Sequence, residues 1–346
     1  MTDPAHLAGP TGVGGDVVVL GTGAMACLFA SRLATRRRVT LAGTWREQVE
    51  HLDRDGVEVL EPDGRSTRRR VSAVDDPRRA PGAALVLVQV KAPATERAAL
   101  WARGILDRSP AKTPGLALSL QNGLGNLEIL ERVVGVGRAA QGVTEQAAHV
   151  VGPGVVRHAA DGPTWLAMRP ETADRLETVA ELFEAVGLPT RRTGDARTLI
   201  WSKLVINCAI NPLTALLGVP NGALVEEPRA RRLMRRAAEE AATVARALGL
   251  ELPFPDAGDR AEEVCRATAG NRSSMLQDLS RGATTEVDFI SGAVVEHGRR
   301  VGVATPVNEL LWQRLSATAP SGPVAAEDAR ELETLIERRD SEPCTS

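Results

Sequence analysis

The feature that most constrains the fold is a glycine-rich turn near the start of the chain. Asp16-Val-Val-Val-Leu20 has the pattern of a buried strand, and an apolar helix is predicted from the turn to about Ala34. The residues between them are Gly21, Thr22, Gly23, Ala24, Met25 and Ala26, a GxGxxA sequence. In such a motif the first glycine makes the turn, the second lets backbone approach a pyrophosphate, and the third position packs helix on strand. The motif therefore predicts a dinucleotide-binding βαβ unit; the alternative is a tight turn that binds nothing.

Further strands extend this pattern. Residues 38–42 form a second predicted strand, and residues 83–90 and 115–120 are apolar runs typical of parallel strands covered on both faces. Lys91 follows the first run and Asn122 follows the second, so both fall at the carboxyl edge, where open α/β sheets bind ligands. We interpret both as candidate cofactor contacts, although Asn-Gly also marks turns that bind nothing.

The end of the second strand bears on the choice of cofactor. NAD enzymes usually place an acid there, whereas a cation accommodates the 2'-phosphate of NADP. This chain has Thr44-Trp45-Arg46, in which Arg46 could reach a phosphate and Thr44 could donate to it. The pattern favours NADPH; the alternative for Arg46 is a surface residue that opens a helix.

The length of 346 residues predicts more than one domain. We expect a flexible tail over 1–15, a Rossmann-type doubly wound sheet over 16–192, an all-helical substrate and catalytic domain over 193–337, and a polar tail over 338–346. Within the first domain, residues 56–73 indicate a hairpin, and the short strands of 138–192 are interpreted as a continuation of the sheet. In the second, we expect helices that begin at Pro228 and end at Gly249, that span 257–281, and that are capped by Thr305.

One apolar segment, residues 199–222, carries an unusual row of polar side chains. Lys203, Asn207 and Asn211 have spacings of four residues, which places them on one face of a helix. A cation and amides in an apolar segment must meet a partner, water or a ligand. A snorkelling lysine is the structural alternative, but the Pro220-Asn221-Gly222 turn just beyond favours a site.

Composition excludes several classes of function. The net charge of -2 gives no field that would favour nucleic acid or membrane. Four scattered cysteines and five isolated histidines have no metal-ligand spacing, so no metal is expected, and the cysteine usage suits a cytoplasmic location. The first lysine or arginine is Arg32, which argues against a signal peptide, and every apolar run of membrane length contains a charge.

Five sequence segments occur in a telling order. They are GTGAMA, VKAPAT at 90–95, QNGLGN at 121–126, WSKLVINCAINPLTALLGVPNG and NRSSMLQDLSRGATTEVDFISG. The set resembles the ketopantoate reductase family, known for 2-dehydropantoate 2-reductases, from about residue 16 to 318. The resemblance implies a Rossmann domain, a helical domain, NADPH and substrate held between them, and a possible homodimer.

Position by position, the resemblance also implies roles. Lys203 matches the catalytic lysine and Glu286 the active-site glutamate; Asn207, Asn221 and Ser274 match substrate-holding residues; Lys91 and Asn122 match contacts near the nicotinamide. The chain departs from the family at Ala26, at Pro93 and Ala94, and at Thr44, which stands where an arginine is usual. These departures bear on how the cofactor fits.

The expected function is NADPH-dependent reduction of a 2-keto acid, with 2-dehydropantoate favoured and a place in pantothenate biosynthesis. Lys203 would donate the proton, since an ammonium stabilises a developing alkoxide and burial lowers the pKa of a lysine. Alternatives are a reductase of the same mechanism on another carbonyl or imine, and a non-catalytic NADPH-binding sensor. For single residues, the alternatives are that Ser274 bonds its own backbone and that Glu286 is an exposed helix charge.

Overall fold

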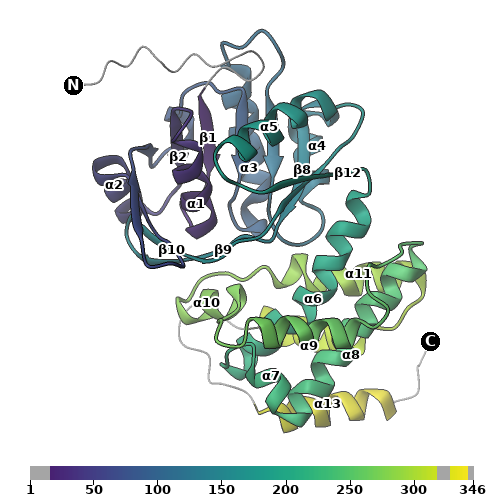
Figure 1. Cartoon of the computed structure of the whole chain (residues 1–346). Coiled ribbons are helices and arrows are strands. Elements are labelled where there is room, and N and C mark those ends of the chain that lie inside the picture. Colours follow the sequence, from purple (N-terminus) through teal and green to yellow (C-terminus); the bar gives the residue numbers. More distant parts are fainter. Residues whose placement is uncertain (1–15, 318–327, 342–346) are drawn as a thin grey trace. The chain divides into compact units, whose positions relative to one another are not determined.

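The computed structural model describes residues 16–317 and 328–341, and its internal contacts divide the chain into two compact units (Figure 1). The first unit holds the chain up to Gln121 together with Gly125–Ala196. The second holds Asn122–Leu124 and the chain from Arg197 onward. The tail expected over 1–15 lies outside the described residues.

The first unit is built on a mostly parallel sheet. Its eight strands have the order β12-β11-β8-β7-β6-β1-β2-β5, and only β11 and β8 among these pairs run antiparallel. The strands are β1 (Val17–Leu20), β2 (Val39–Ala42), β5 (Ser72–Val74), β6 (Leu85–Val88), β7 (Leu116–Ser119), β8 (Ala139–Thr144), β11 (Thr164–Ala167) and β12 (Thr190–Thr193). This arrangement confirms the predicted doubly wound α/β class.

Helices cover both faces of this sheet. They are α1 (Ala24–Leu33), α2 (Arg46–Asp55), α3 (Thr95–Asp107), α4 (Asn126–Val134) and α5 (Ala173–Ala185), with short 3-10 turns η2 (Pro77–Arg79), η3 (Ala92–Ala94) and η4 (Val136–Arg138). Alternate residues of β1 face opposite sides. Val17 and Val19 pack in one core with α1, α2 and α5, whereas Val18 and Leu20 pack in another with α3 and α4. All four β1 side chains are therefore buried, as their apolar run predicts.

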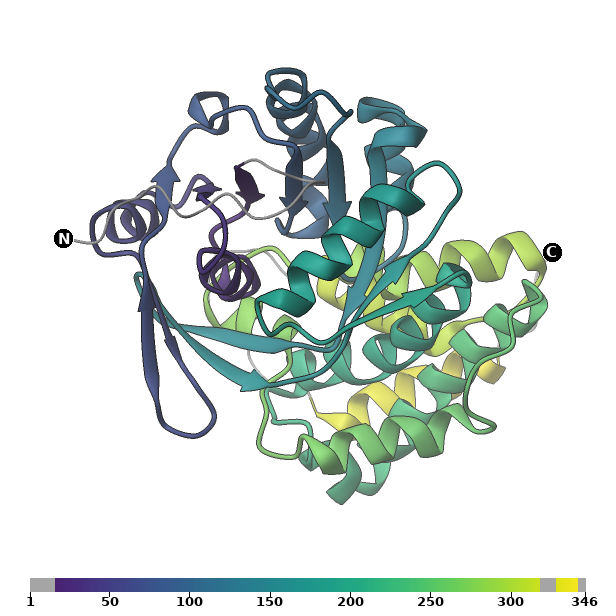
Figure 2. The same cartoon turned by 45° about the horizontal axis from the view of Figure 1, so that its top comes forward.

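A second, four-stranded sheet has the order β4-β3-β10-β9 (Figure 1, Figure 2). Its strands are β3 (Val57–Leu60), β4 (Ser66–Arg69), β9 (Ala147–Gly152) and β10 (Val155–Ala160). The antiparallel β3–β4 pair confirms the predicted hairpin. The expectation that all short strands of 138–192 continue the main sheet is wrong for β9 and β10, because β10 pairs with β3 and β9 instead. Both strands are only partly buried, which suits a sheet with one open face rather than one covered on both sides.

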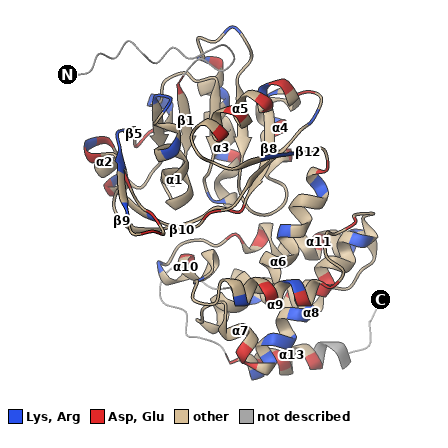
Figure 3. Ribbon diagram, viewed as in Figure 1, with Lys and Arg blue, Asp and Glu red and all other residues tan. Residues whose placement is uncertain are grey.

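The second unit is helical. Its elements are α6 (Ala196–Leu217), α7 (Ala223–Glu226), α8 (Pro228–Ala247), α9 (Ala257–Ala267), α10 (Ser274–Ser280), η5 (Val287–Phe289), α11 (Ser291–Val301), α12 (Pro306–Ser316) and α13 (Ala329–Ser341). Charges of both signs mark α8 and α13 (Figure 3). Helix α13 runs to Ser341, so residues 338–341 are helical where a polar tail was expected, and residues 342–346 lie outside the described part.

Two sequence predictions in this unit need correction. Residues 257–281 form two helices rather than one, because the Ser273 hydroxyl accepts a hydrogen bond from the Leu276 amide (3.1 Å) and starts a new helix there. Thr305 stands at the start of α12, but its side chain makes no capping bond. The Glu240 carboxylate takes that role by accepting from the amides of Val307 and Asn308, each at 2.9 Å.

Helix α6 is the one described helix with the length and mean hydropathy of a membrane span. However, 67% of its most apolar window is buried inside the structure, as in the core helix of a helical domain. Its side chains Leu204, Cys208 and Leu213 lie in the core shared with α8 and α9.

Candidate functional site

The glycine turn after β1 has the geometry that its sequence predicts. Gly21 has φ +125°, and a Cβ there would lie 2.7 Å from the carbonyl oxygen of Gln89, so only glycine fits. At Gly23 an added Cβ would meet no atom within 4 Å, so open space stands before this residue. Gly23 is the N-cap of α1, which has no side-chain cap and no acid in its first turn. Ala26 is fully buried. An uncapped helix N-terminus with this open space fits the pyrophosphate of a dinucleotide.

Gln48 supports this turn and was missed in the sequence. Its side chain is fully buried; Nε2 donates to the Thr22 carbonyl (2.9 Å), and Oε1 accepts from the Gly154 amide (2.8 Å). The bonds join α2 to the turn and to the loop between β9 and β10. No local pattern signals this role, because a lone glutamine on an amphipathic helix reads as a surface residue.

The candidate 2'-phosphate residues follow β2. Thr44 and Arg46 are exposed, and Arg46 is the first residue of α2. Its guanidinium forms an ion pair with Glu50 at 3.1 Å, with 82% of the Arg46 side chain exposed. Arg46 thus opens a helix at the surface, as the alternative interpretation states, and its contact with a phosphate stays a prediction.

The ends of β6 and β7 are tied together at the same sheet edge. Lys91 is exposed at the N-cap position of η3. Gln121, which the sequence reading did not single out, is buried; its Nε2 donates to the Val90 carbonyl and to Thr95 Oγ1, both at 2.8 Å. Its Oε1 accepts from the Ser119 hydroxyl at 2.9 Å. These bonds fix the backbone that carries Lys91.

In the second unit, the polar row of α6 is graded in burial. Lys203 and Asn207 are half-buried and Asn211 is buried, while the neighbouring Leu204 and Cys208 are almost wholly inside. The row therefore lies along one helix face, as its spacing predicts, with its first two members reachable by solvent. This placement is compatible with the site and with the snorkelling alternative.

The turn that follows α6 is held by the loop between α9 and α10. The Asn221 amide donates to the Asn271 carbonyl (2.9 Å), the Gly222 amide donates to the Ala269 carbonyl (3.0 Å), and Asn221 Nδ2 donates to Thr268 Oγ1 (2.9 Å). Asn221 Oδ1 is buried and has no hydrogen-bond partner among the described residues. An orphaned acceptor of this kind suits a ligand that brings a donor.

Ser274 is the first residue of α10 and is half-buried. Its neighbour Ser273, rather than Ser274, caps the helix and also accepts from Thr214 Oγ1 at 2.7 Å. The start of α10 is thereby fixed to the C-terminal half of α6. The substrate role of Ser274 stays a prediction.

Glu286 is only 5% exposed, so the alternative of an exposed helix charge is wrong. It stands at the N-cap of η5, and the Phe289 carbonyl at the end of η5 accepts from the Leu124 amide at 3.0 Å. Gly123, with φ +86°, packs so closely that a Cβ would lie 2.5 Å from the same oxygen. The second unit thus brings together the segments that carry Asn122 and Glu286, which are far apart in sequence.

Other kinds of reactive centre find no support in the described residues. No group of three His, Cys, Asp or Glu side chains in that part of the chain is placed to hold a metal. Cys27, Cys208 and Cys265 are free and buried, and burial raises the pKa of the Cys27 thiol to about 12. A buried neutral thiol is a poor nucleophile.

The fold and these two sets of residues define a class, that of dinucleotide-dependent oxidoreductases with a Rossmann unit and a helical unit. The model of the ketopantoate reductase PanE/ApbA family matches residues 17–171, and that of the C-terminal part of the same family matches residues 195–319. The chain belongs to the ketopantoate reductase family.

Individual relatives agree with this assignment. The chain is 39% identical over 297 residues to a 2-dehydropantoate 2-reductase of Halobacterium salinarum. The aligned region covers 85% of this chain and 96% of the relative. A crystal structure of a PanE/ApbA family ketopantoate reductase from Ralstonia eutropha is similar with TM-score 0.77 and 30% identity, covering 93% of this chain and 99% of that one. A D-mandelate dehydrogenase solved with NADH shares the fold, with TM-score 0.79, 23% identity, and coverage of 93% and 99%.

Proposed function

We propose that this protein reduces 2-dehydropantoate, a 2-keto acid, to the corresponding 2-hydroxy acid with NADPH. The observation that carries the proposal is the match to a 2-dehydropantoate 2-reductase over 96% of that relative's length. The family models match residues 17–171 and 195–319, which include the glycine turn and the polar residues of α6. We further propose that the enzyme is cytoplasmic and that it forms a homodimer. Light scattering of the purified chain tests the homodimer directly.

The glycine turn supports the cofactor part of the proposal. When bound, the nicotinamide supplies the hydride that a keto acid needs at carbon. In this proposal Gly23 and the N-terminus of α1 bind the pyrophosphate. Lys91 and Asn122 contact the nicotinamide end of the cofactor, and Thr44 and Arg46 bind its 2'-phosphate.

The second unit supplies the groups proposed for the substrate. Lys203 would donate a proton from Nζ to the carbonyl oxygen as negative charge develops there. Asn207 and Asn221 would hold the substrate, and the unpartnered Oδ1 of Asn221 offers an acceptor for a hydroxyl. Ser274 would bind the carboxylate. Glu286, a buried residue, would accept from a substrate hydroxyl and orient the lysine.

The experiment is a steady-state assay of NADPH oxidation on 2-dehydropantoate and a panel of other 2-keto acids, with Lys203→Ala as the key variant. We expect Lys203→Ala to lower kcat by roughly a hundredfold or more, the usual contribution of general acid catalysis. Lys112, an exposed loop residue, provides the matched control in Lys112→Ala, which should keep wild-type rates.

Two outcomes would replace the proposal. A higher kcat/KM on another carbonyl or on an imine would make this a reductase of the same mechanism in a different pathway. NADPH binding with no turnover across the whole panel would indicate a sensor. Wild-type activity of Lys203→Ala on the best substrate would refute the assigned proton donor.

A further inference from the structure

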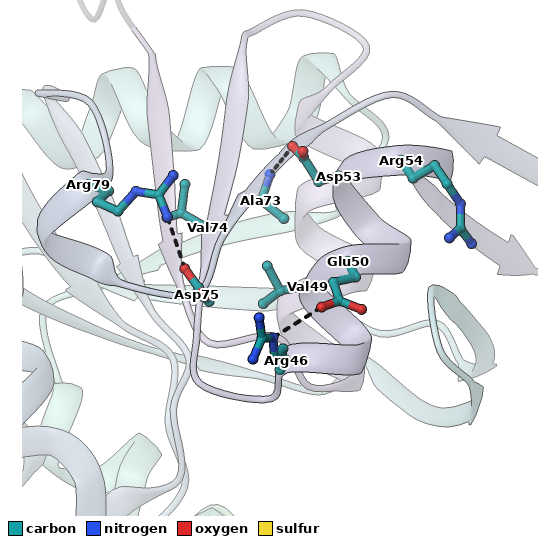
Figure 4. Close-up of a pocket in the computed structure, with 9 residues that line it drawn as sticks. All are labelled: Arg46, Val49, Glu50, Asp53, Arg54, Ala73, Val74, Asp75 and Arg79. Carbon is teal, nitrogen blue, oxygen red and sulfur yellow. Dashed lines mark hydrogen bonds and ion pairs between the residues drawn. The ribbon is translucent and has the colours of Figure 1, made fainter.

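A pocket in the first unit is lined in part by Arg46, one of the two residues predicted to meet the 2'-phosphate (Figure 4). Its volume is about 530 Å³, and it opens between α2, β5 and η2. Arg46, Arg54 and Arg79 line it together with Glu50, Asp53 and Asp75. Arg79 belongs to none of the sequence motifs described above, and it has no part in the proposed reaction.

The sheet register places the segment that carries Arg79 at the carboxyl edge of the sheet. β5 pairs in parallel with β2 on its outer side, with Val74 opposite Ala42, and the Gly43 amide donates to the Val74 carbonyl at 3.1 Å. The chain segments that leave these two strands, one toward Arg46 and one toward Arg79, therefore emerge side by side. In a Rossmann unit the carboxyl edge at the second strand receives the adenosine ribose.

The backbone that carries Arg79 is anchored, whereas the Arg79 guanidinium is exposed and can exchange its partner. Pro77 and Ala80 are buried, and the Asp76 carboxylate caps η2 by accepting from the Arg78 amide at 3.0 Å. Within the described part of the chain, the Arg79 guanidinium has one partner, Asp75, at 3.2 Å, with 69% and 47% of the two side chains exposed. Such an exposed pair contributes roughly 0 to 1 kcal/mol and is easily exchanged.

Arg46 is in the same condition. Its partner Glu50 is 62% exposed, and the pair closes at 3.1 Å on the rim of the pocket. Two arginines from neighbouring segments thus face one pocket, each held by a weak, replaceable carboxylate. The other two charged residues on the wall are engaged elsewhere, since Asp53 accepts from the Ala73 amide (3.0 Å) and Arg54 pairs with Asp55 (2.7 Å).

We propose that Arg79 is a second determinant of cofactor choice, which binds the 2'-phosphate of NADPH together with Arg46. The inference rests on the proposed use of NADPH. A phosphate dianion offers three acceptor oxygens, enough for two guanidinium groups to bind it with charge-assisted hydrogen bonds. In exchange, Asp75 and Glu50 are released to solvent.

The same pocket permits an opposite outcome, because an acid at this edge binds the ribose 2'-hydroxyl of NADH. Asp75 is the acid in question, and with Arg79 turned away it would repel a phosphate. The wild-type preference between the two cofactors decides between these readings.

The test is isothermal titration of NADPH and of NADH, without keto acid, into wild type, Arg46→Ala, Arg79→Ala and Arg79→Gln. We expect both Arg79 variants to raise the Kd for NADPH by about tenfold or more, since hydrogen bonds between charged groups are the strong ones. The Kd for NADH should change less than about twofold, because that cofactor lacks the phosphate. The matched control is Arg78→Ala, which removes the adjacent arginine that pairs with Asp76 and does not line the pocket.

The inference would be overturned by equal effects of Arg79→Ala on the Kd values for NADPH and NADH, by an equal effect of Arg78→Ala, or by tighter wild-type binding of NADH than of NADPH. If Arg46→Ala is selective for NADPH while both Arg79 variants bind as wild type, NADPH use stands and the role of Arg79 falls. Because binding is measured without substrate, absence of turnover on 2-dehydropantoate would refute the proposed function and leave this inference intact.

Discussion

Replacing each glycine of the dinucleotide turn by alanine should separate stability from cofactor binding. At Gly23 the backbone is extended (φ −76°), and the added methyl group meets no protein atom within 4 Å. Loss of unfolded-state freedom favours the variant by about 0.4 to 1 kcal/mol, and alanine at an N-cap costs a similar amount. The free energy of unfolding of the apo protein should therefore change by less than about 1 kcal/mol.

The same methyl group occupies the open space before the α1 N-terminus. It would keep a pyrophosphate away from backbone amides, and each lost charge-assisted hydrogen bond costs roughly 1.5 to 3 kcal/mol. We expect the Kd for NADPH to rise roughly 10- to 100-fold.

Gly21→Ala supplies the contrast. It forces φ +125° on a residue with a Cβ and places that atom 2.7 Å from the Gln89 carbonyl oxygen. Strain and overlap should lower the free energy of unfolding by roughly 2 kcal/mol or more. For both variants, urea unfolding measures the free energy of unfolding and titration calorimetry measures the Kd for NADPH. A Gly23→Ala protein that binds NADPH as wild type, or that unfolds as easily as Gly21→Ala, would refute the reasoning.

Two further predictions concern buried polar groups of the first unit. Gln48→Leu should lower the free energy of unfolding by roughly 2 to 4 kcal/mol and weaken NADPH binding, because the Gly154 amide and the Thr22 carbonyl both lose a hydrogen-bond partner. Urea unfolding measures the stability and titration calorimetry measures the binding. An unchanged free energy of unfolding would contradict the prediction. The Arg32 guanidinium, with His158 as a second partner, holds the pKa of Glu61 below its usual range. The ionised Glu61 therefore contributes its full share to the free energy of unfolding above the ordinary glutamate pKa. That contribution is lost as the pH falls through the lower pKa of the folded state. Glu61→Gln should therefore cost stability near neutral pH and flatten its decline in acid, measured by urea unfolding from pH 7 to pH 3; a wild-type slope in the variant would contradict the assignment.

The parts of the fold that local chemistry determines were predictable. An apolar run such as that of β1, directly before a glycine turn, is typical of a strand covered on both faces, and Gly21 and Gly23 stand where their conformation or their lack of a side chain is needed. The α6 row could be placed on one helix face because spacing alone fixes it. Glu286 was assigned only through the resemblance, since a single glutamate carries no local sign that it is buried.

The parts that depend on distant partners were not predictable. Ser273 interrupts a pattern that reads as one helix, and its bond from Thr214 comes from an element far back in the chain. Thr305 has the right residue type and position for a cap, but Glu240 reaches the same amides first. Gln121 shows the same limit, because its value lies in joining two strand ends that only the folded sheet brings together.

The pairing of β3 with β10 has a consequence for synthesis on the ribosome. The hairpin β3–β4 is complete by Arg69, yet the neighbour that β3 needs on its other side begins at Val155. Until that later segment has emerged, one edge of the hairpin keeps unpaired amides and carbonyls that another nascent chain could join. Fragments that end before Val155 should accordingly aggregate far more readily than fragments that end after Ala160.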